Sequence, residues 1–297
     1  MDFGKIGGDN IAYRGKYGKN NGKNLLYCRT CGKRFAATRN SPLFGAHLSP
    51  DQVFQIVRHA AEGVSVRASA RLLGISKAAV NLVILKAGDH CQKVFRALMS
   101  SFQLTEVQLD ELRTFVKKTA ADEKELEQGF GEAWIWTAID TPTRLIVNFK
   151  VGRHYLVDVD AREMIQKVHR SLAGDKPLFV SDELQHCASV LEEEFSHEEP
   201  IPRTGKRGRP ARPKTVIDDD LIYDTVKKTR NKGHIVKVER SVVFGTETGF
   251  QERLVDPPSN TINTAYVERS NPAWRLWDVH LTRKPVTFAK ARKWLEA

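Results

Sequence analysis

The sequence has no long apolar run and few cysteines. No stretch of its 297 residues approaches the roughly 20 consecutive apolar residues that a membrane-spanning helix needs. The opening residues, MDFGKIGGDN, contain no apolar core of a secretory signal. Four cysteines are too few for a disulfide framework in a chain of this length. These absences predict a cytoplasmic protein in a reducing compartment.

Basic residues are scarce in the middle of the chain and abundant around it. Residues 101–200 carry eleven Lys and Arg against twenty Asp and Glu, whereas residues 201–240 carry twelve against five. The net charge of +11 predicts binding to a polyanion. A protein that only coats nucleic acid needs no acidic centre, whereas an enzyme that holds metal ions and grips phosphates does. The alternative is a solvated acidic face, chiefly the run EEEFSHEE at residues 192–199.

One cysteine pair has the spacing of a zinc knuckle. In YCRTCGKRF, two residues separate Cys28 from Cys31 and a glycine follows, so both thiolates can bind one metal on a tight turn. A closed structural zinc site needs four ligands, and neither a second such pair nor a histidine precedes Cys28. A pair of free cysteines on a turn is the alternative. We expect a partial zinc-ribbon-like segment over residues 1–45, with Zn²⁺ on these two thiolates.

Residues 46–100 are predicted to form a helix-turn-helix DNA-binding domain. Ser49 as a cap, Pro50 at the first helical position and the apolar spacing after them are typical of a helix. In RASARLLGISKAAV, Gly74 breaks one helix and Ser76 caps the next, which is the order of a helix-turn-helix. An ordinary pair of antiparallel helices is the alternative.

This motif also predicts which side chains pack and which contact DNA. The apolar face of its first helix is expected to contain Ala68, Leu72 and Leu73. The side chains expected to contact DNA are Arg67, Lys77 and Asn81.

From residue 101 the periodicity becomes that of β-strands. Runs rich in β-branched and aromatic residues are interrupted by one helical segment, residues 160–174. Three strands in a meander, a helix and a fourth strand predict the start of an RNase H-like α/β sheet, within a catalytic domain over residues 101–297. The strand-like runs are LTEVQLDELRTFV, EAWIWTAID, TRLIVNFKVG and PLFVSDE.

A basic region at about residues 200–262 is predicted to be a β insertion in this domain. It begins with IPRTGKRGRPARPKT, in which RGRP looks like an AT-hook that places arginines in a narrow minor groove. A flexible linker is the alternative. Two strand-like runs flank Asn231, Lys232 and Gly233, which predicts a hairpin. The residues of this region expected to bind DNA are Lys206, Arg207, Arg209 and Arg212.

Three carboxylates lie where strands end or where a helix faces a sheet. Asp110 is inside the apolar strand VQLDEL, Asp182 ends PLFVSD and Glu268 lies in YVERSN. An acid in a buried strand is costly unless it is paired, protonated or bound to metal. Three converging carboxylates can hold two Mg²⁺ ions for an in-line phosphoryl transfer. Asp140 is a rival ligand, but the TPTR after it predicts a turn cap; Glu111 is predicted to face the opposite side of its strand.

Together these segments resemble the transposases of the insertion-sequence-one family, the long prokaryotic variety, over nearly the whole chain. The resemblance is carried by YCRTCGKRFAATRNSPLFG, RASARLLGISKAAV, LDELRTFV, WIWTAIDTPTRLIVNFKVG, FVSDE, RTGKRGRPARPK and NTAYVERSN. It implies an RNase H-like fold and DDE chemistry, with Asp110, Asp182 and Glu268 as catalytic ligands of Mg²⁺ or Mn²⁺. It also implies double-stranded DNA as partner, as terminal inverted repeats and target, and a homodimer or larger multimer on that DNA.

The expected function is therefore that of a DNA transposase that cleaves and joins strands at the ends of an insertion sequence. A catalytically inactive, DNA-binding remnant or regulator derived from a transposase is the alternative. The resemblance implies an intact protein that extends beyond both ends of this chain. Pro272 predicts that the helix carrying Glu268 begins near Val267, because a proline in a helix interior costs about 3 kcal/mol.

Overall fold

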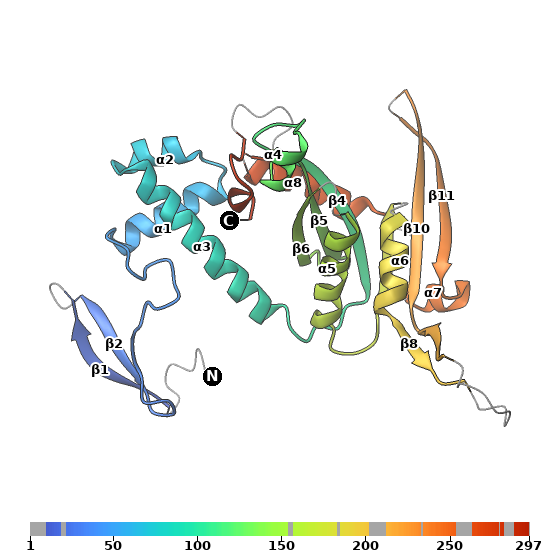
Figure 1. Ribbon diagram of the computed structural model, residues 1–297, viewed down its shortest axis with the longest axis horizontal. Coiled ribbons are helices and arrows are strands. Elements are labelled where there is room, and N and C mark those ends of the chain that lie inside the picture. The colour runs from blue at the N-terminus through green and yellow to red at the C-terminus, as the bar shows by residue number, and fades with distance from the viewer. Residues whose placement is uncertain are drawn as a thin grey trace. The chain divides into compact units, whose positions relative to one another are not determined.

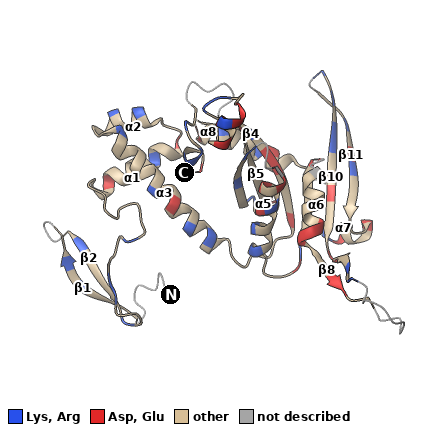
Figure 2. Cartoon of the chain, viewed as in Figure 1, with Lys and Arg blue, Asp and Glu red and all other residues tan. Residues whose placement is uncertain are grey.

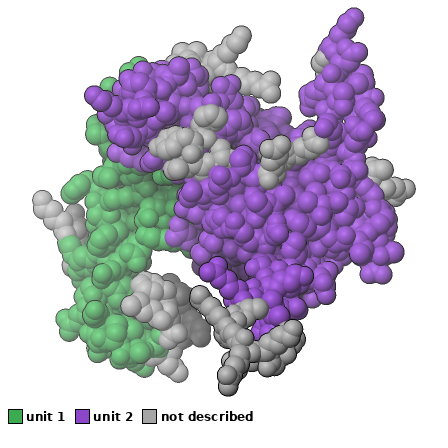
Figure 3. Space-filling view, turned by 45° about the vertical axis from the view of Figure 1, so that its right-hand side comes forward, with its two compact units in different colours: residues 1–95, 277–279, 296–297 green, residues 96–276, 280–295 purple. Residues whose placement is uncertain are grey.

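The chain divides into two compact units. In the computed structural model, the first unit holds residues 1–95, 277–279 and 296–297, and the second holds residues 96–276 and 280–295 (Figure 3). The structure describes residues 10–18, 22–153, 157–182, 185–201, 212–232, 234–253, 263–278, 280–281 and 288–296.

The first unit opens with a small antiparallel sheet. Its strands β1 (Ile11–Tyr17), β2 (Lys23–Cys28) and β3 (Arg34–Ala36) pair in sequence order. Among the described residues of these strands only Ala36 is buried. Strands this rich in Gly, Lys and Asn have too few apolar side chains to build a core of their own.

Three helices follow, and each begins at a serine. They are α1 (Pro50–Ala61), α2 (Val66–Leu73) and α3 (Lys77–Leu98). Ser49 and Gln52 form a capping box at α1. The Ser76 hydroxyl accepts the N–H of Ala79 at 3.1 Å, so the expected cap of α3 is confirmed.

The break between α2 and α3 is short and sharply bent. It contains three residues, of which Gly74 has a φ of 64°, the left-handed conformation that glycine adopts without strain. The two helices are bent by 116° at this break. That angle falls within the range of roughly 90–120° that is typical of helix-turn-helix pairs. No single helix in the described part is long and apolar enough to cross a membrane, and only the bent pair α2–α3 passes that test, by length and composition alone.

The prediction that Leu72 belongs to the packing face of α2 is wrong, because this residue is 70% exposed. The core of this unit instead contains Ala70, with Val66 and Leu73 packed against it. Consecutive helical residues are rotated by about 100°, so Leu72 and Ala70 point to nearly opposite sides and cannot both face the core.

The second unit is built on a mixed six-stranded sheet with the order β11-β10-β7-β4-β5-β6 (Figure 1). Strands β4, β5 and β6 form an antiparallel meander, β7 is parallel to β4, and β10 is parallel to β7. β11 pairs antiparallel with β10 at the edge. The strands are β4 (Glu106–Val116), β5 (Gly131–Asp140), β6 (Ile146–Arg153), β7 (Leu178–Asp182), β10 (Ile222–Asn231) and β11 (His234–Phe244).

Helices cover both faces of this sheet, so the unit is a layered α/β arrangement. The expected strands and the expected helix are confirmed, with the helix beginning at Val157 rather than residue 160. The remaining elements are α4 (Glu123–Glu127), α5 (Val157–Ser171), α6 (Gln185–Glu194), β8 (Ser196–Glu199), β9 (Lys214–Ile217), α7 (Glu247–Arg253), α8 (Ala265–Trp277) and a 3-10 turn, Arg292–Trp294.

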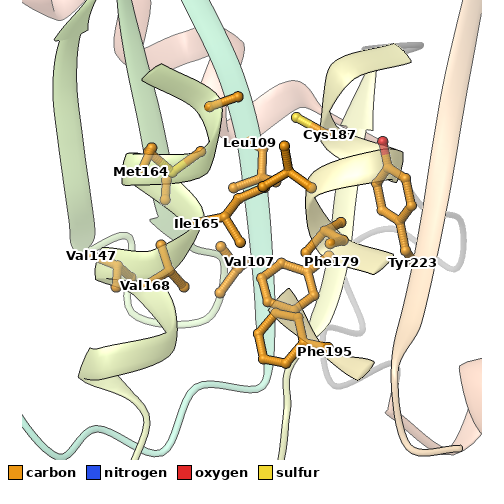
Figure 4. Close-up of a cluster of buried hydrophobic side chains, with 14 of the residues drawn as sticks. Val107, Leu109, Val147, Met164, Ile165, Val168, Phe179, Cys187, Phe195 and Tyr223 are labelled. Carbon is orange, nitrogen blue, oxygen red and sulfur yellow. The ribbon is translucent and has the colours of Figure 1, made fainter. Parts of the chain in front are cut away.

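The alternation of β4 divides its side chains between two cores. Val107 and Leu109 point into the main cluster with α5 and α6 (Figure 4). Leu112 and Val116 point the other way, into a cluster against which Trp274 of α8 packs. The even-numbered residues of β4 therefore face α8, which decides where Asp110 points.

The basic region contains part of the central sheet rather than an insertion alone. Ile222, Tyr223 and Val226 of β10 are buried, and the strand pairs with β7 along its inner half. The interpretation of the whole region as an insertion is wrong for this strand, because its pairing with β7 is a long-range contact that the basic composition of residues 201–240 does not indicate. The expected hairpin at Asn231 is confirmed by the pairing of that residue with His234.

Candidate functional site

Two of the three candidate carboxylates come from neighbouring parallel strands. Leu109 of β4 pairs with Ser181 of β7, so the next residues, Asp110 and Asp182, lie at adjacent positions of the register. Adjacent positions on parallel strands are about 4.8 Å apart and point to the same face. Both acids face the side of the sheet on which α8 lies.

The third carboxylate comes from α8, and its position is set by a glutamine on β4. Gln108 is 1% exposed, and its Oε1 accepts the backbone N–H groups of Tyr266 and Val267, each at 3.1 Å. Its Nε2 donates to the carbonyl oxygen of Asn263 at 2.6 Å. One side-chain amide thus satisfies the first turn of α8, whose N–H groups have no partner within the helix. Because Gln108 precedes Asp110 by two residues on the same face, it places Glu268 above Asp110.

The three carboxylates form one group, called here the carboxylate cluster (Asp110, Asp182 and Glu268), because Asp182 and Glu268 share a hydrogen-bond partner and both repel the charge of Asp110. The Thr264 hydroxyl lies 2.7 Å from Asp182 Oδ1 and 3.1 Å from Glu268 Oε1. Asn271, one turn after Glu268, donates from Nδ2 to Asp110 Oδ2 at 2.7 Å. Asp182 and Glu268 remain partly open to solvent, with side-chain exposures of 40% and 34%.

A lysine lies inside this cluster. Lys228 of β10 donates from Nζ to Glu268 Oε1 and to Thr264 Oγ1, and its ammonium is 3.6 Å from Asp182 Oδ1. Its side chain is 11% exposed. Lys228 shares its strand face with Ile222 and Val226, the face that also carries Asp182 across the β7–β10 pairing.

The donors of the cluster fit a hard divalent cation in their chemistry, because carboxylate and hydroxyl oxygens are the ligands that Mg²⁺ prefers. In the arrangement described, however, the Lys228 ammonium and the Asn271 amide occupy these oxygens. Accordingly, no group of three or more His, Cys, Asp or Glu within the described ranges is placed to hold a metal ion. Metal binding at this cluster therefore requires side chains to move.

Burial and mutual repulsion raise the pKa of acids on β4. Burial is the largest cause for Asp110, whose pKa is raised to about 6. The hydrogen bond from Asn271 lowers this pKa, and the charges of Asp182 and Glu268 raise it further. Burial likewise raises the pKa of Glu111 to about 8, with added repulsion from Asp110 and Asp182. The Glu111 Oε2 atom is buried and finds no hydrogen-bond partner in the described part of the chain.

Asp140 has the role of a turn residue. Its Oδ2 accepts the N–H and the hydroxyl of Thr143 at 3.2 and 2.6 Å. The Thr143 contacts close the turn between β5 and β6, as the sequence after Asp140 predicts.

Pro272 lies inside α8, not in its first turn. The helix begins at Ala265, two residues before the expected start, and continues through Pro272 to Trp277. Proline lacks the N–H that would bond the carbonyl of Glu268. Tertiary contacts hold the helix on both sides of this gap: Gln108 before it, and Arg275 after it, which donates to the Leu281 carbonyl at 2.6 Å.

The cysteine pair forms a tight turn, but no third ligand joins it within the described residues. The Gly32 N–H donates to the Cys28 carbonyl at 2.9 Å, and Gly32 has a φ of 68°, so the glycine closes the turn as expected. Hydrogen bonds from the backbone and thiol of Cys31 lower the pKa of Cys28. Zinc binding by Cys28 and Cys31 stays a prediction.

The residues expected to contact DNA have different surroundings. Arg67 at the start of α2 and Lys77 at the start of α3 are exposed, whereas Asn81 is half-buried. Arg212 is exposed just before β9. Lys and Arg also gather on β1, β2 and the outer part of the β10–β11 ribbon (Figure 2). Three further candidates lie outside the described residues: Lys206, Arg207 and Arg209.

Sequence reasoning missed four residues of the site, namely Gln108, Lys228, Thr264 and Asn271. The available signal for Gln108 was its position in the apolar strand VQLDEL, two residues before Asp110. Lys228 also follows a period-2 pattern with Val226, but its strand was assigned to an insertion. Thr264 and Asn271 lie within one turn of Glu268 and could have been found from helical spacing.

Comparison of the sequence with protein-family models finds no match, and comparison with curated proteins finds no relative.

Replacing Gln108 is expected to destabilise the second unit. Gln108→Ala leaves two N–H groups of α8 and one carbonyl without their buried partner, and each such group costs about 1–3 kcal/mol. We expect the unfolding free energy in urea to fall by about 2–4 kcal/mol in all, after partial rehydration. Gln103→Ala, an exposed glutamine just before β4, is the matched control. Equal losses in the two variants would contradict the capping role.

Replacing Glu111 is expected to make the protein less sensitive to alkaline pH. Its folded pKa of about 8 exceeds the ordinary glutamate pKa of 4.5, so its stabilising contribution is present below about pH 4.5 and is lost as pH rises to about 8. Glu111→Gln should raise the unfolding free energy by about 1–3 kcal/mol at pH 8 and leave it unchanged at pH 4. Urea unfolding at both pH values measures this, with the exposed Glu127→Gln as control. A gain that does not depend on pH would refute the explanation.

Proposed function

We propose that this protein is a DNA transposase that cleaves and joins DNA strands at the ends of an insertion sequence. The observation that carries the proposal is the convergence of Asp110, Asp182 and Glu268 from β4, β7 and α8. These residues are far apart in the sequence and lie on one partly open face of a sheet. Asp182 and Glu268 share Thr264 and Lys228 as partners, and Asp110 accepts a hydrogen bond from Asn271 of the helix that carries Glu268. Such a cluster suits metal-dependent phosphoryl transfer better than a structural role, because three acids placed together repel one another and the ammonium of Lys228 compensates only one of the three charges.

In this proposal the carboxylates would hold Mg²⁺ or Mn²⁺. The bound ions would activate the attacking oxygen and stabilise the leaving oxygen of an in-line displacement. The protein's own residues orient the ligands: Thr264 holds Asp182 and Glu268 together, and Asn271 fixes Asp110. Gln108 fixes the helix from which Glu268 projects.

The strand order supports an RNase H-like assignment for the second unit. Three antiparallel strands, β6-β5-β4, are followed in the sheet by β7 and β10, each parallel to its neighbour. The expectation from the sequence periodicity is a meander, a helix and a further strand, and the insertion-sequence-one resemblance implies an RNase H-like fold. The acids on β4 and β7 lie at the centre of that order, where neighbouring strands bring them together.

Double-stranded DNA is the proposed partner of both units. In the first, the 116° bend between α2 and α3 is compatible with a recognition helix that begins at Lys77. In the second, basic side chains on the β10–β11 ribbon would bind phosphates (Figure 2). Because both ends of an element have to be joined, a homodimer or larger multimer on DNA is the proposed active form.

The catalytic proposal is tested by Asp182→Asn. With Mg²⁺ or Mn²⁺ and DNA from either side of the coding region as donor, wild-type protein should insert donor ends into a supercoiled plasmid. Asp182→Asn should lower strand transfer at least about 100-fold, because one metal ligand loses its charge, while DNA binding in a gel-shift assay stays the same.

Asp140→Asn is the matched control for that test. The same change then affects an acid that caps the β5–β6 turn, where an amide oxygen can still accept from Thr143. Strand transfer should stay near the wild-type rate. Undiminished transfer by Asp182→Asn would remove Asp182 from the catalytic set.

A DNA-binding protein without catalysis is the second candidate. The observation that favours it is the occupation of the carboxylates by Lys228 and Asn271. This candidate predicts salt-sensitive binding of terminal repeats and no cleavage with any divalent metal. Detectable strand transfer by the wild-type protein rejects it.

DNA binding by the helix-turn-helix is tested by Lys77→Ala. Loss of one phosphate contact at the start of α3 should weaken DNA binding and make the slope of log K against log salt shallower by about 1. Fluorescence anisotropy at several salt concentrations measures both. Lys93→Ala is the control, since Lys93 is exposed on the same helix and pairs with Asp89. Indistinguishable slopes in the two variants would argue against a recognition helix at Lys77.

A further inference from the structure

The ammonium of Lys228 lies where the oxygens of Asp182 and Glu268 come closest to a common point. It donates to Glu268 Oε1, lies 3.6 Å from Asp182 Oδ1, and also donates to the hydroxyl of Thr264 that links the two acids. A single cation therefore contacts both carboxylates. In the described ion pairs of Asp182 and Glu268, the positively charged partner is Lys228 in each case.

The charge of the carboxylate cluster explains why a cation lies there. Three acids share one face of the sheet, and two of them, Asp182 and Glu268, lie within reach of the single hydroxyl of Thr264. One ammonium compensates one of three negative charges, which leaves the cluster short of positive charge. A divalent ion would compensate more, but it needs the same oxygens, and two cations at one point repel each other strongly.

The side chain and its strand allow the ammonium to leave. Lysine carries its charge on a flexible four-carbon stem and is readily hydrated, unlike a planar arginine fork. Val226 is the last fully buried residue of β10, and the strand beyond Lys228 is exposed as far as Asn231. The stem can therefore turn toward the exposed ribbon without disturbing a core.

We propose that Lys228 is an internal counter-ion of the carboxylate cluster, which a divalent cation displaces before it binds to Asp182 and Glu268. The inference rests on the proposed function, because it takes these acids to be metal ligands. Lys228 is then a positioning residue: it keeps the acids together without metal, and it lowers their affinity for the metal.

The wild-type chain tests this displacement directly. Metal-free protein is treated briefly with an amine-acetylating reagent, with and without saturating Mn²⁺, and acetylation is measured by peptide mass spectrometry. Lys228 should be protected without metal and become several-fold more reactive with Mn²⁺. Lys227, exposed on the other face of the same strand, should not change. Unchanged protection of Lys228 at saturating Mn²⁺ overturns the proposal.

A matched pair of variants tests the competition. In Lys228→Gln an amide can still donate to Thr264 and Glu268, but the competing charge is gone; Lys227→Gln removes the same charge at an exposed neighbour. Mn²⁺ affinity, measured from the free-ion paramagnetic resonance signal, should rise about tenfold or more in Lys228→Gln. Lys227→Gln should stay within about twofold of wild type. Equal or weaker Mn²⁺ binding by Lys228→Gln overturns the counter-ion role.

Failure of this inference can be told apart from failure of the proposed function. If wild-type protein transfers strands and Lys228→Gln binds Mn²⁺ no more tightly, the counter-ion role alone is rejected. If Lys228→Gln binds Mn²⁺ more tightly but wild-type protein transfers no strands, the counter-ion is supported and the transposase proposal fails.

Discussion

The side-chain amide of Gln108 is the contact on which the geometry of the site depends. Strand β4 and helix α8 are separated by more than a hundred residues of chain, and their relative position has to be fixed by a specific contact. Gln108 makes that contact with both of its polar atoms, to two N–H groups and one carbonyl at the start of α8. A glutamine suits this place because it donates and accepts at once, so no buried polar group is left over. An apolar residue at the same position would pack, but would not set the rotation or the height of the helix.

Around this contact, the acids of the site differ in their burial and therefore in their access to solvent. Asp110 and Glu111 are buried enough for their pKa values to rise, whereas Asp182 and Glu268 are partly open. Thr264 and Lys228 contact the open acids Asp182 and Glu268 with a hydroxyl and an ammonium, and the Asn271 amide contacts the more buried Asp110. Functional sites commonly contain acids whose pKa values are raised in this way.

Much of the fold follows from local pattern, and most of what was missed depends on long-range contacts. The period-2 runs located β4 to β7, and Ser49 and Ser76 located the starts of α1 and α3, because these signals act within a few residues. Pattern alone could not reveal that β10 joins the sheet, since its short apolar run lies between three aspartates and two lysines and its pairing with β7 is a long-range contact. Leu72 shows the limit at closer range, where a short helix offers two apolar faces and only packing chooses between them.

The candidate site divides in the same way. Asp110 and Asp182 could be predicted as site residues from the sequence, because an acid within or at the end of an apolar strand is unusual. That they are neighbours depends on the register between β4 and β7, which no local signal encodes. Lys228 was out of reach for the same reason. Pro272 was misplaced because helix propensity weighs a proline heavily, whereas tertiary contacts on both sides of it hold α8 together.

The exposure of β11 has a consequence for self-association. As the edge of the sheet it presents one row of unpaired backbone groups, and Ile235, Val236 and Val238 add exposed apolar surface. Such an edge is a template for unwanted pairing with a strand of another chain. Charged residues interrupt it, with Lys237 and Glu239 paired to each other and Arg240 paired to Asp224 and Glu247. Any strand that stacks on this edge has to accommodate those charges, so the ribbon can be long and apolar while aggregation remains unfavourable.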